Sequence, residues 1–158
     1  MSEEPHVLAE VADGIGWLTL NRPDARNANS PQIVELLIEH TAAFERNPEV
    51  RCVVLRSNGS HFMSGGDVRG FYRSLVEERE RHLASYEMRI VKTHQYIYQI
   101  RRMPKPVLVS VQGPAAGIGV SLILAADLAI VICPHQSGPS TILVWPLKER
   151  ENGQETRA

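Results

Sequence analysis

Short runs of hydrophobic residues alternate along this chain with longer segments in which hydrophobic residues recur at every third or fourth position. The short runs have the length and composition of buried β-strands, and they lie at residues 7–11, 15–20, 52–55, 107–111 and 128–132. Asp13-Gly14 joins the first two runs and predicts a β-hairpin. The helical spacing occurs after Ser30 and near residues 80–102, and residues 120–126 resemble a helix that is apolar on nearly all sides.

The predicted helices carry clear start and stop signals. Ser30 is a suitable N-cap, Pro31 follows at the first helical position, and Asn47-Pro48 ends that helix. Strands and helices therefore alternate, and the strands are too short and too apolar to be exposed. This order predicts an α/β fold with largely parallel strands and with helices outside the sheet.

The composition narrows the classes of protein to consider. The 158 residues have the length of one domain, and a formal net charge of −1 gives no general attraction to nucleic acid or to an anionic membrane. The longest apolar stretch, residues 120–133, is interrupted by Ser121 and Asp127 and is too short to cross a bilayer. Cys52 and Cys133 form neither a disulfide framework nor a metal-ligand pattern. We therefore expect an intracellular protein, in the cytoplasm or an organelle matrix, with no metal site and no nucleic-acid or membrane partner.

Two glycine-rich turns, at residues 61–67 and 112–120, are the strongest chemical signal. Each turn follows a strand-like run and precedes a helix-like one. Two backbone N–H groups presented together at helix entrances can stabilise a carbonyl oxygen that is becoming negative. The pair of turns therefore predicts an oxyanion hole.

An ordered set of motifs surrounds these turns. The set comprises Gly16–Pro23, Arg26–Ala28, Phe62–Asp67, Pro104–Val107, Gly113–Gly119 and Ala126–Leu128. Across residues 7–131 the chain strongly resembles the crotonase superfamily, which includes enoyl-CoA hydratases and enoyl-CoA isomerases. The resemblance implies a crotonase-like spiral of ββα units with an acyl-CoA thioester lying across it. It also implies that the backbone N–H groups of Gly66 and Ile118 form the oxyanion hole.

The same resemblance implies which residues contact the substrate. These residues are Arg22, Arg26, Ala28, Ser64, Gly65 and Gly117. Coenzyme A is part of that substrate, so no separate cofactor is expected. Arg22 and Arg26 are suited to the nucleotide phosphates, although Arg22 fits a solvated turn residue equally well. Asp67 is expected to cap the next helix rather than to act in catalysis.

The chain also departs from the superfamily pattern. Hydratases carry a glutamate at the position of Ser121, and a serine hydroxyl is no general base at its usual pKa. A second family glutamate would fall near Thr141, where the resemblance has ended. We therefore expect a core at residues 1–132, a divergent and poorly ordered tail at residues 133–158, and a family fold that lacks its C-terminal part. Hydratase activity and the homotrimer of the family are accordingly in doubt.

Other interpretations remain open. The chain can be an enzyme of the enoyl-CoA hydratase/isomerase type, or a non-catalytic acyl-CoA-binding or regulatory fragment that associates with full-length subunits. Clp-type serine peptidases resemble the second turn, but their nucleophile would fall on Gly117. His61 is interpreted as a solvated turn residue, and His94 as a core residue of the long helix.

Overall fold

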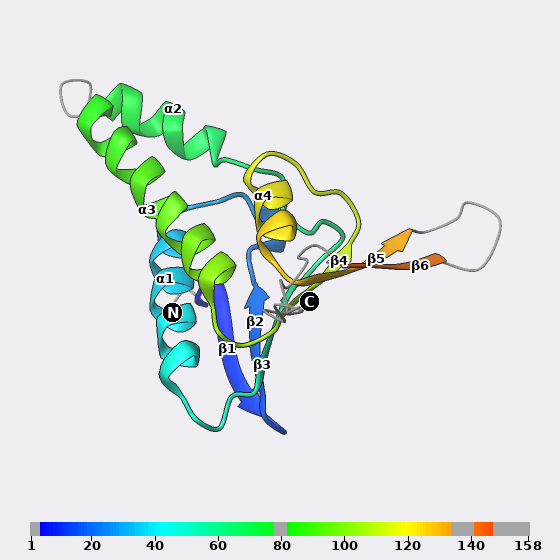
Figure 1. The fold of residues 1–158 in the computed structure, drawn as a ribbon. Coiled ribbons are helices and arrows are strands. Elements are labelled where there is room, and N and C mark those ends of the chain that lie inside the picture. Colours follow the sequence, from blue (N-terminus) through cyan, green and yellow to red (C-terminus); the bar gives the residue numbers. More distant parts are fainter. Residues whose placement is uncertain (1–3, 78–81, 134–140, 147–158) are drawn as a thin grey trace, which may run out of the picture.

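The computed structural model describes residues 4–77, 82–133 and 141–146, and within these residues it contains one six-stranded β-sheet (Figure 1). The order of strands in the sheet follows the chain: β1 (Val7–Ala12), β2 (Ile15–Leu20), β3 (Cys52–Ser57), β4 (Val107–Gln112), β5 (Leu128–Cys133) and β6 (Thr141–Pro146). The strands from β2 to β5 are parallel, whereas β1 and β6 pair antiparallel at the two edges. The predicted α/β fold with largely parallel strands is confirmed.

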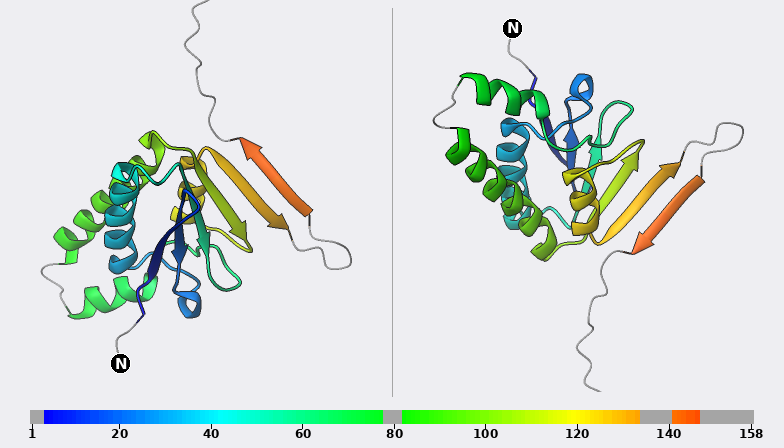
Figure 2. Two further views of the ribbon diagram at one scale, coloured as in Figure 1. Left: turned by 90° about the horizontal axis from the view of Figure 1, so that it is seen from below. Right: turned by 90° about the horizontal axis from the view of Figure 1, so that it is seen from above.

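The described residues also form four α-helices: α1 (Pro31–Arg46), α2 (Val68–Glu77), α3 (His82–Arg102) and α4 (Ile118–Ala125). α1 packs against α3 and along β1 and β2, and α4 packs against α3. Figure 2 shows these three helices close together, with β5 and β6 extending away from α1 and α3. Within the described part of the chain, no helix combines the length and the hydrophobicity that crossing a membrane requires.

α1 begins and ends where the sequence predicts. The Ser30 hydroxyl accepts a hydrogen bond from the Ile33 N–H at 3.2 Å, and Pro31 occupies the first turn. At the other end Asn47 adopts an extended conformation before Pro48, which cannot continue a helix. These local signals set the two ends of α1. The apolar face of α1, which includes Leu37 and Phe44, packs against the sheet.

The hydrophobic core lies between the sheet and the helices. Side chains with an exposed fraction of 1% or less come from every layer, among them Leu20, Leu55, Ile33, Ile100 and Leu122. Tyr96 of α3 is also fully buried, and its hydroxyl donates to the Asn29 side-chain oxygen at 3.2 Å. Burial raises the pKa of Tyr96, so the phenol stays neutral and α3 is fixed to the loop before α1.

β6 lies in a stretch where the sequence predicts a poorly ordered tail. This strand pairs antiparallel with β5, with Val131 opposite Leu143. The apolar run at residues 142–145 therefore continues the sheet, because it can satisfy the backbone donors and acceptors at the edge of β5. Residues 134–140 and 147–158 of the predicted tail lie outside the described residues.

Candidate functional site

The two glycine-rich turns lie side by side. β3 and β4 are neighbouring parallel strands, so their carboxyl ends meet at the same edge of the sheet. Beyond these strands the Phe62 N–H donates to the Pro114 carbonyl at 3.0 Å, and the Ala116 N–H donates to the Met63 carbonyl at 2.9 Å. Backbone pairing therefore continues past the sheet and holds one turn against the other.

Glycine is required where the two turns come closest. Gly65 has φ +102°, and a Cβ atom there would lie 3.3 Å from the Ala116 carbonyl oxygen. Gly117 has φ +53°, and its Cβ would lie 3.5 Å from the Gly65 Cα. L-residues rarely adopt such φ values. Gly65 and Gly117, which the resemblance assigns to substrate contact, thus permit the close approach of the turns.

Gly66 and Ile118 each present a backbone N–H at this junction. Ile118 is the first residue of α4, so its N–H has no acceptor within the helix. Among the described residues, no backbone oxygen accepts a hydrogen bond from the N–H of Gly66 or Ile118. Both residues line one cavity of about 250 Å³, called here the smaller cavity. The two turns thus contribute one backbone donor each to a single concave site.

One face of α3 also lines the smaller cavity, through Tyr86, Arg89, Ile90, Thr93 and His94. Phe71 of α2 also lines this cavity. Its ring meets the Tyr86 ring edge-on at a centroid distance of 5.3 Å, and the Arg89 guanidinium lies 4.6 Å from its centroid. These aromatic and cation–π contacts connect α2 to α3 along the cavity wall.

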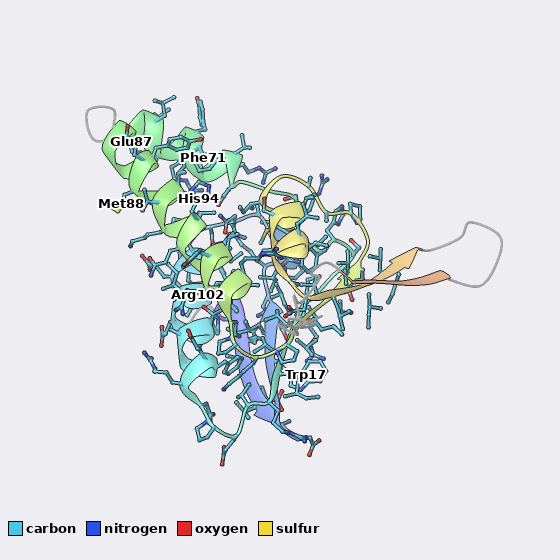
Figure 3. All side chains as sticks on the ribbon, in the orientation of Figure 1. Trp17, Phe71, Glu87, Met88, His94 and Arg102 are labelled. Carbon is cyan, nitrogen blue, oxygen red and sulfur yellow. The ribbon has the colours of Figure 1, made fainter. Side chains whose placement is uncertain are left out.

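The interpretation of His94 as a core residue is wrong. Its side chain is exposed and lines the smaller cavity, and Figure 3 shows it on α3 in the region where that helix approaches Phe71. The helical spacing of residues 86, 90 and 94 is real, but that face is directed to the cavity. The core is reached instead by Tyr96 and Ile100. Periodicity alone does not distinguish a core face from a cavity face.

A larger cavity of about 560 Å³ is also lined by residues of the first turn. It is lined by four of the six residues that the resemblance assigns to substrate contact, Arg22, Arg26, Ala28 and Ser64, together with Gly66. Sequence analysis missed two further cationic side chains in its wall, Arg69 and Arg73 of α2. Their spacing of four residues directly after the glycine turn was the available signal.

The larger cavity is suited to an anionic ligand. Guanidinium groups bind phosphate and carboxylate oxygens well, and four arginines line this wall. The described residues contain no group of three or more His, Cys, Asp or Glu side chains that could hold a metal ion. Asp24 and Asp67 also line the larger cavity, so the four arginines leave a net positive charge there.

Arg22 is paired within the protein. Its Nη1 donates to the Asp67 carboxylate at 2.8 Å and to the Ala28 carbonyl at 3.2 Å. Asp67 also accepts from the Gly70 N–H at 3.0 Å, so the expected capping of α2 by Asp67 is confirmed. Burial of the Asp67 carboxyl opposes its ionisation, but the Gly70 N–H and the Arg22 guanidinium outweigh this effect and hold its pKa below the usual range.

Asn27, within the Arg26–Ala28 motif, is a positioning residue to which the sequence assigns no role. It is buried with φ +53°, a conformation that asparagine tolerates better than most residues. Its side-chain oxygen accepts from the Arg22 N–H at 2.8 Å, and its side-chain nitrogen donates to the Asn58 and His61 carbonyls at 2.9 Å each. One side chain therefore ties the arginine-bearing loop to the first glycine turn.

Comparison with known proteins gives a consistent result. Residues 15–134 match the model of the enoyl-CoA hydratase/isomerase family. An enoyl-CoA isomerase/hydratase of Mycosarcoma maydis is 33% identical over 135 residues, which cover 80% of this chain and 46% of that protein. A 4-chlorobenzoyl coenzyme A dehalogenase of an Arthrobacter species is 29% identical over 129 residues, covering 82% of this chain and 46% of that one.

Solved structures show the same likeness. The crystal structure of an enoyl-CoA hydratase/isomerase from Xanthobacter autotrophicus superposes with a TM-score of 0.70 at 27% identity, covering 80% of this chain and 45% of that chain. The described α/β architecture is therefore the crotonase-type fold. The chain spans about half the length of the curated relatives it matches.

Proposed function

Because this chain belongs to the enoyl-CoA hydratase/isomerase family, we propose that it binds an acyl-CoA thioester with the thioester carbonyl at Gly66. The observation that carries this proposal is that Gly66 lines both cavities. The smaller cavity would receive the acyl group, and the larger cavity would receive the coenzyme A portion. A ligand with one uncharged end and one phosphate-bearing end matches this division.

The backbone donors of Gly66 and Ile118 would bind the thioester oxygen. Removal of the proton on the carbon next to the carbonyl converts this oxygen into an enolate oxygen. Two donors aimed at such an oxygen stabilise the enolate more than the neutral thioester, and each can contribute about 3 kcal/mol to lowering the barrier. The proposed site thus favours enolate chemistry at the carbon next to the thioester.

The positive charge of the larger cavity would bind the phosphates of coenzyme A. Arg26, Arg69 and Arg73 supply this charge in the proposal. Arg22 donates to Asp67 at 2.8 Å, so we assign it to shaping the cavity wall. Coenzyme A enters as part of the substrate, and the proposal needs no further cofactor.

Hydration of an enoyl-CoA is not the reaction that these residues favour. Ser121, half-buried on α4, stands where the superfamily hydratases carry a glutamate, and neither cavity described above includes it. A hydroxyl cannot deprotonate water near neutral pH as a positioned carboxylate can. We therefore expect thioester binding with slow turnover of crotonyl-CoA, measured by the loss of enoyl absorbance.

The proposal is tested by removing one backbone donor. Ile118→Pro deletes the N–H at the first position of α4, where proline is well tolerated. Loss of one hydrogen bond of about 1 kcal/mol should weaken the binding of butyryl-CoA about 5-fold by calorimetry. Ile118→Val keeps the N–H and should bind like the parent.

A matched ligand completes the test. S-butyl-CoA, a thioether, lacks the carbonyl oxygen, so its affinity should be the same for the parent and for Ile118→Pro. Equal weakening of both ligands would mean that proline disturbs the cavity rather than a carbonyl contact. Failure of the parent chain to bind butyryl-CoA would refute the proposed function.

A further inference from the structure

We propose that His94 is the proton acceptor of the smaller cavity and removes the proton on the carbon next to the thioester carbonyl of a bound acyl group. This inference rests on the proposed function, because it requires the acyl group to occupy the smaller cavity. His94 lies on α3, outside both glycine-rich turns. It lines the same cavity as Gly66 and Ile118.

The other side chains of this cavity cannot accept a proton near neutral pH. Among the described lining residues, the titratable ones are Tyr86, Arg89 and His94. A guanidinium does not lose its proton in proteins, and a phenol is a poor base because it is already protonated. The amide of Asn29 and the hydroxyl of Thr93 are not bases. The imidazole of His94 is the remaining candidate, since a neutral imidazole has one ring nitrogen that can accept a proton.

The position of His94 is fixed relative to the first glycine turn. The Asn29 N–H donates to the Gly65 carbonyl at 2.8 Å, and the Asn29 side-chain nitrogen donates to the Thr93 hydroxyl at 3.3 Å. The Asn29 side-chain oxygen accepts from Tyr96 at 3.2 Å. Thr93 and Tyr96, which flank His94 in sequence, therefore attach α3 to the turn that carries Gly66.

The volume of the smaller cavity guides the choice of the acyl group used as a probe. A volume of about 250 Å³ is below the range of about 300–1,000 Å³ that is usual for drug-sized ligands. Short acyl groups of a few carbon atoms fit this space beside the thioester. Butyryl-CoA is therefore the appropriate probe.

The chemical step is a reversible proton transfer. An imidazole nitrogen of His94 forms an N–H bond as the C–H bond next to the carbonyl breaks. The C–H electron pair forms the carbon–carbon double bond of the enolate, and the carbonyl π pair moves onto the oxygen held by the Gly66 and Ile118 N–H groups. In D2O the imidazolium exchanges its proton for a deuteron, and return of this deuteron yields labelled acyl-CoA.

The test measures this exchange. The full chain is incubated in D2O with butyryl-CoA, and loss of the signal of the protons next to the carbonyl is followed by NMR. We expect His94→Gln to slow the exchange by about 100-fold or more, in line with the removal of a general base. His40→Gln changes a histidine of α1 that lines neither cavity and should exchange like the parent.

The pH dependence supplies a second readout. Only the neutral form of an imidazole can accept a proton, so exchange by the parent should be slower at about pH 5 than at about pH 8, and His94→Gln should abolish this difference. The other ionisable groups near His94 are Tyr86 and Arg89 on α3, and Asp67 before α2, which interacts electrostatically with Arg89. Asp67 is ionised throughout this range because its pKa is lowered.

The outcomes separate this inference from the proposed function. Calorimetry should show that His94→Gln still binds butyryl-CoA, which also shows that the variant is folded. Exchange by His94→Gln at the parent rate would overturn the role of His94 and leave the binding proposal intact. The role of His94 would also be overturned if the parent bound butyryl-CoA without exchange. A parent that does not bind butyryl-CoA would refute the proposed function itself.

Discussion

Asp67 joins three parts of the site through one carboxyl group. It caps α2 through the Gly70 N–H, pairs with Arg22 of the preceding loop, and interacts electrostatically with Arg89 of α3. Its side chain is only 9% exposed, so these interactions are weakly screened by solvent. A single residue thus connects the walls of both cavities.

The lowered pKa of Asp67 predicts how stability depends on pH. A group whose pKa is lower in the folded chain stabilises it above the unfolded-state pKa of about 4, and this contribution is lost as pH falls through the folded-state pKa. We expect Asp67→Asn to lower the free energy of unfolding by about 1–3 kcal/mol at pH 7 and by a smaller amount at pH 3, measured with urea.

A matched control is available on the surface. Glu35 pairs with Lys92 at 3.5 Å, and both side chains are well exposed. Glu35→Gln should therefore change the free energy of unfolding by less than about 0.5 kcal/mol at either pH. Equal effects of the two substitutions would contradict the role given to Asp67.

At the scale of elements, the attachment of α3 decides the shape of the smaller cavity. α3 packs against α1 and α4, yet its cavity face is fixed by polar contacts with Asn29. The buried Tyr96 hydroxyl depends on the Asn29 side-chain oxygen for its hydrogen bond. The loop before α1 therefore determines where a helix far along the chain lies.

Asn29→Ala tests this attachment. It leaves the Tyr96 hydroxyl buried without its partner, which should lower the free energy of unfolding by about 1–3 kcal/mol in urea. Amide hydrogen exchange in α3 should also accelerate. Thr93→Val removes only the longer contact of 3.3 Å at a half-buried position and should cost about 0.5 kcal/mol. If Asn29→Ala cost no more than Thr93→Val, the attachment would not depend on Asn29.

At the scale of the whole molecule, the cavities gather residues from the loop before α1, both glycine turns, α2 and α3. A ligand bound there stabilises the folded chain as a unit. We expect butyryl-CoA at 100 times its dissociation constant to raise the free energy of unfolding by about 2.7 kcal/mol. Thermal unfolding would reveal this as a rise in Tm, which should be smaller for Ile118→Pro at the same ligand concentration. No rise with the parent would contradict specific binding to the folded state.

The elements with local signals were predictable from the sequence. The hairpin at Asp13-Gly14 and the helix start at Ser30-Pro31 depend on neighbouring residues, and both are present. The partner of Arg22 was not predictable, because Asp67 lies far along the chain and the pair forms only through the fold. The direction of His94 was missed for the same reason, since helical spacing identifies a face without identifying what it meets. The strand at residues 141–146 was not predicted, because it lies beyond the last of the motifs that accompany the other strands.

The pairing of β3 with β4 has a consequence for folding kinetics. α2 and α3 both lie between these strands along the chain, so their parallel pairing requires the closure of a long crossover. No local interaction can bring the two glycine turns together beforehand. The capacity to bind a thioester should therefore arise in the same, comparatively slow, kinetic phase in which the centre of the sheet forms.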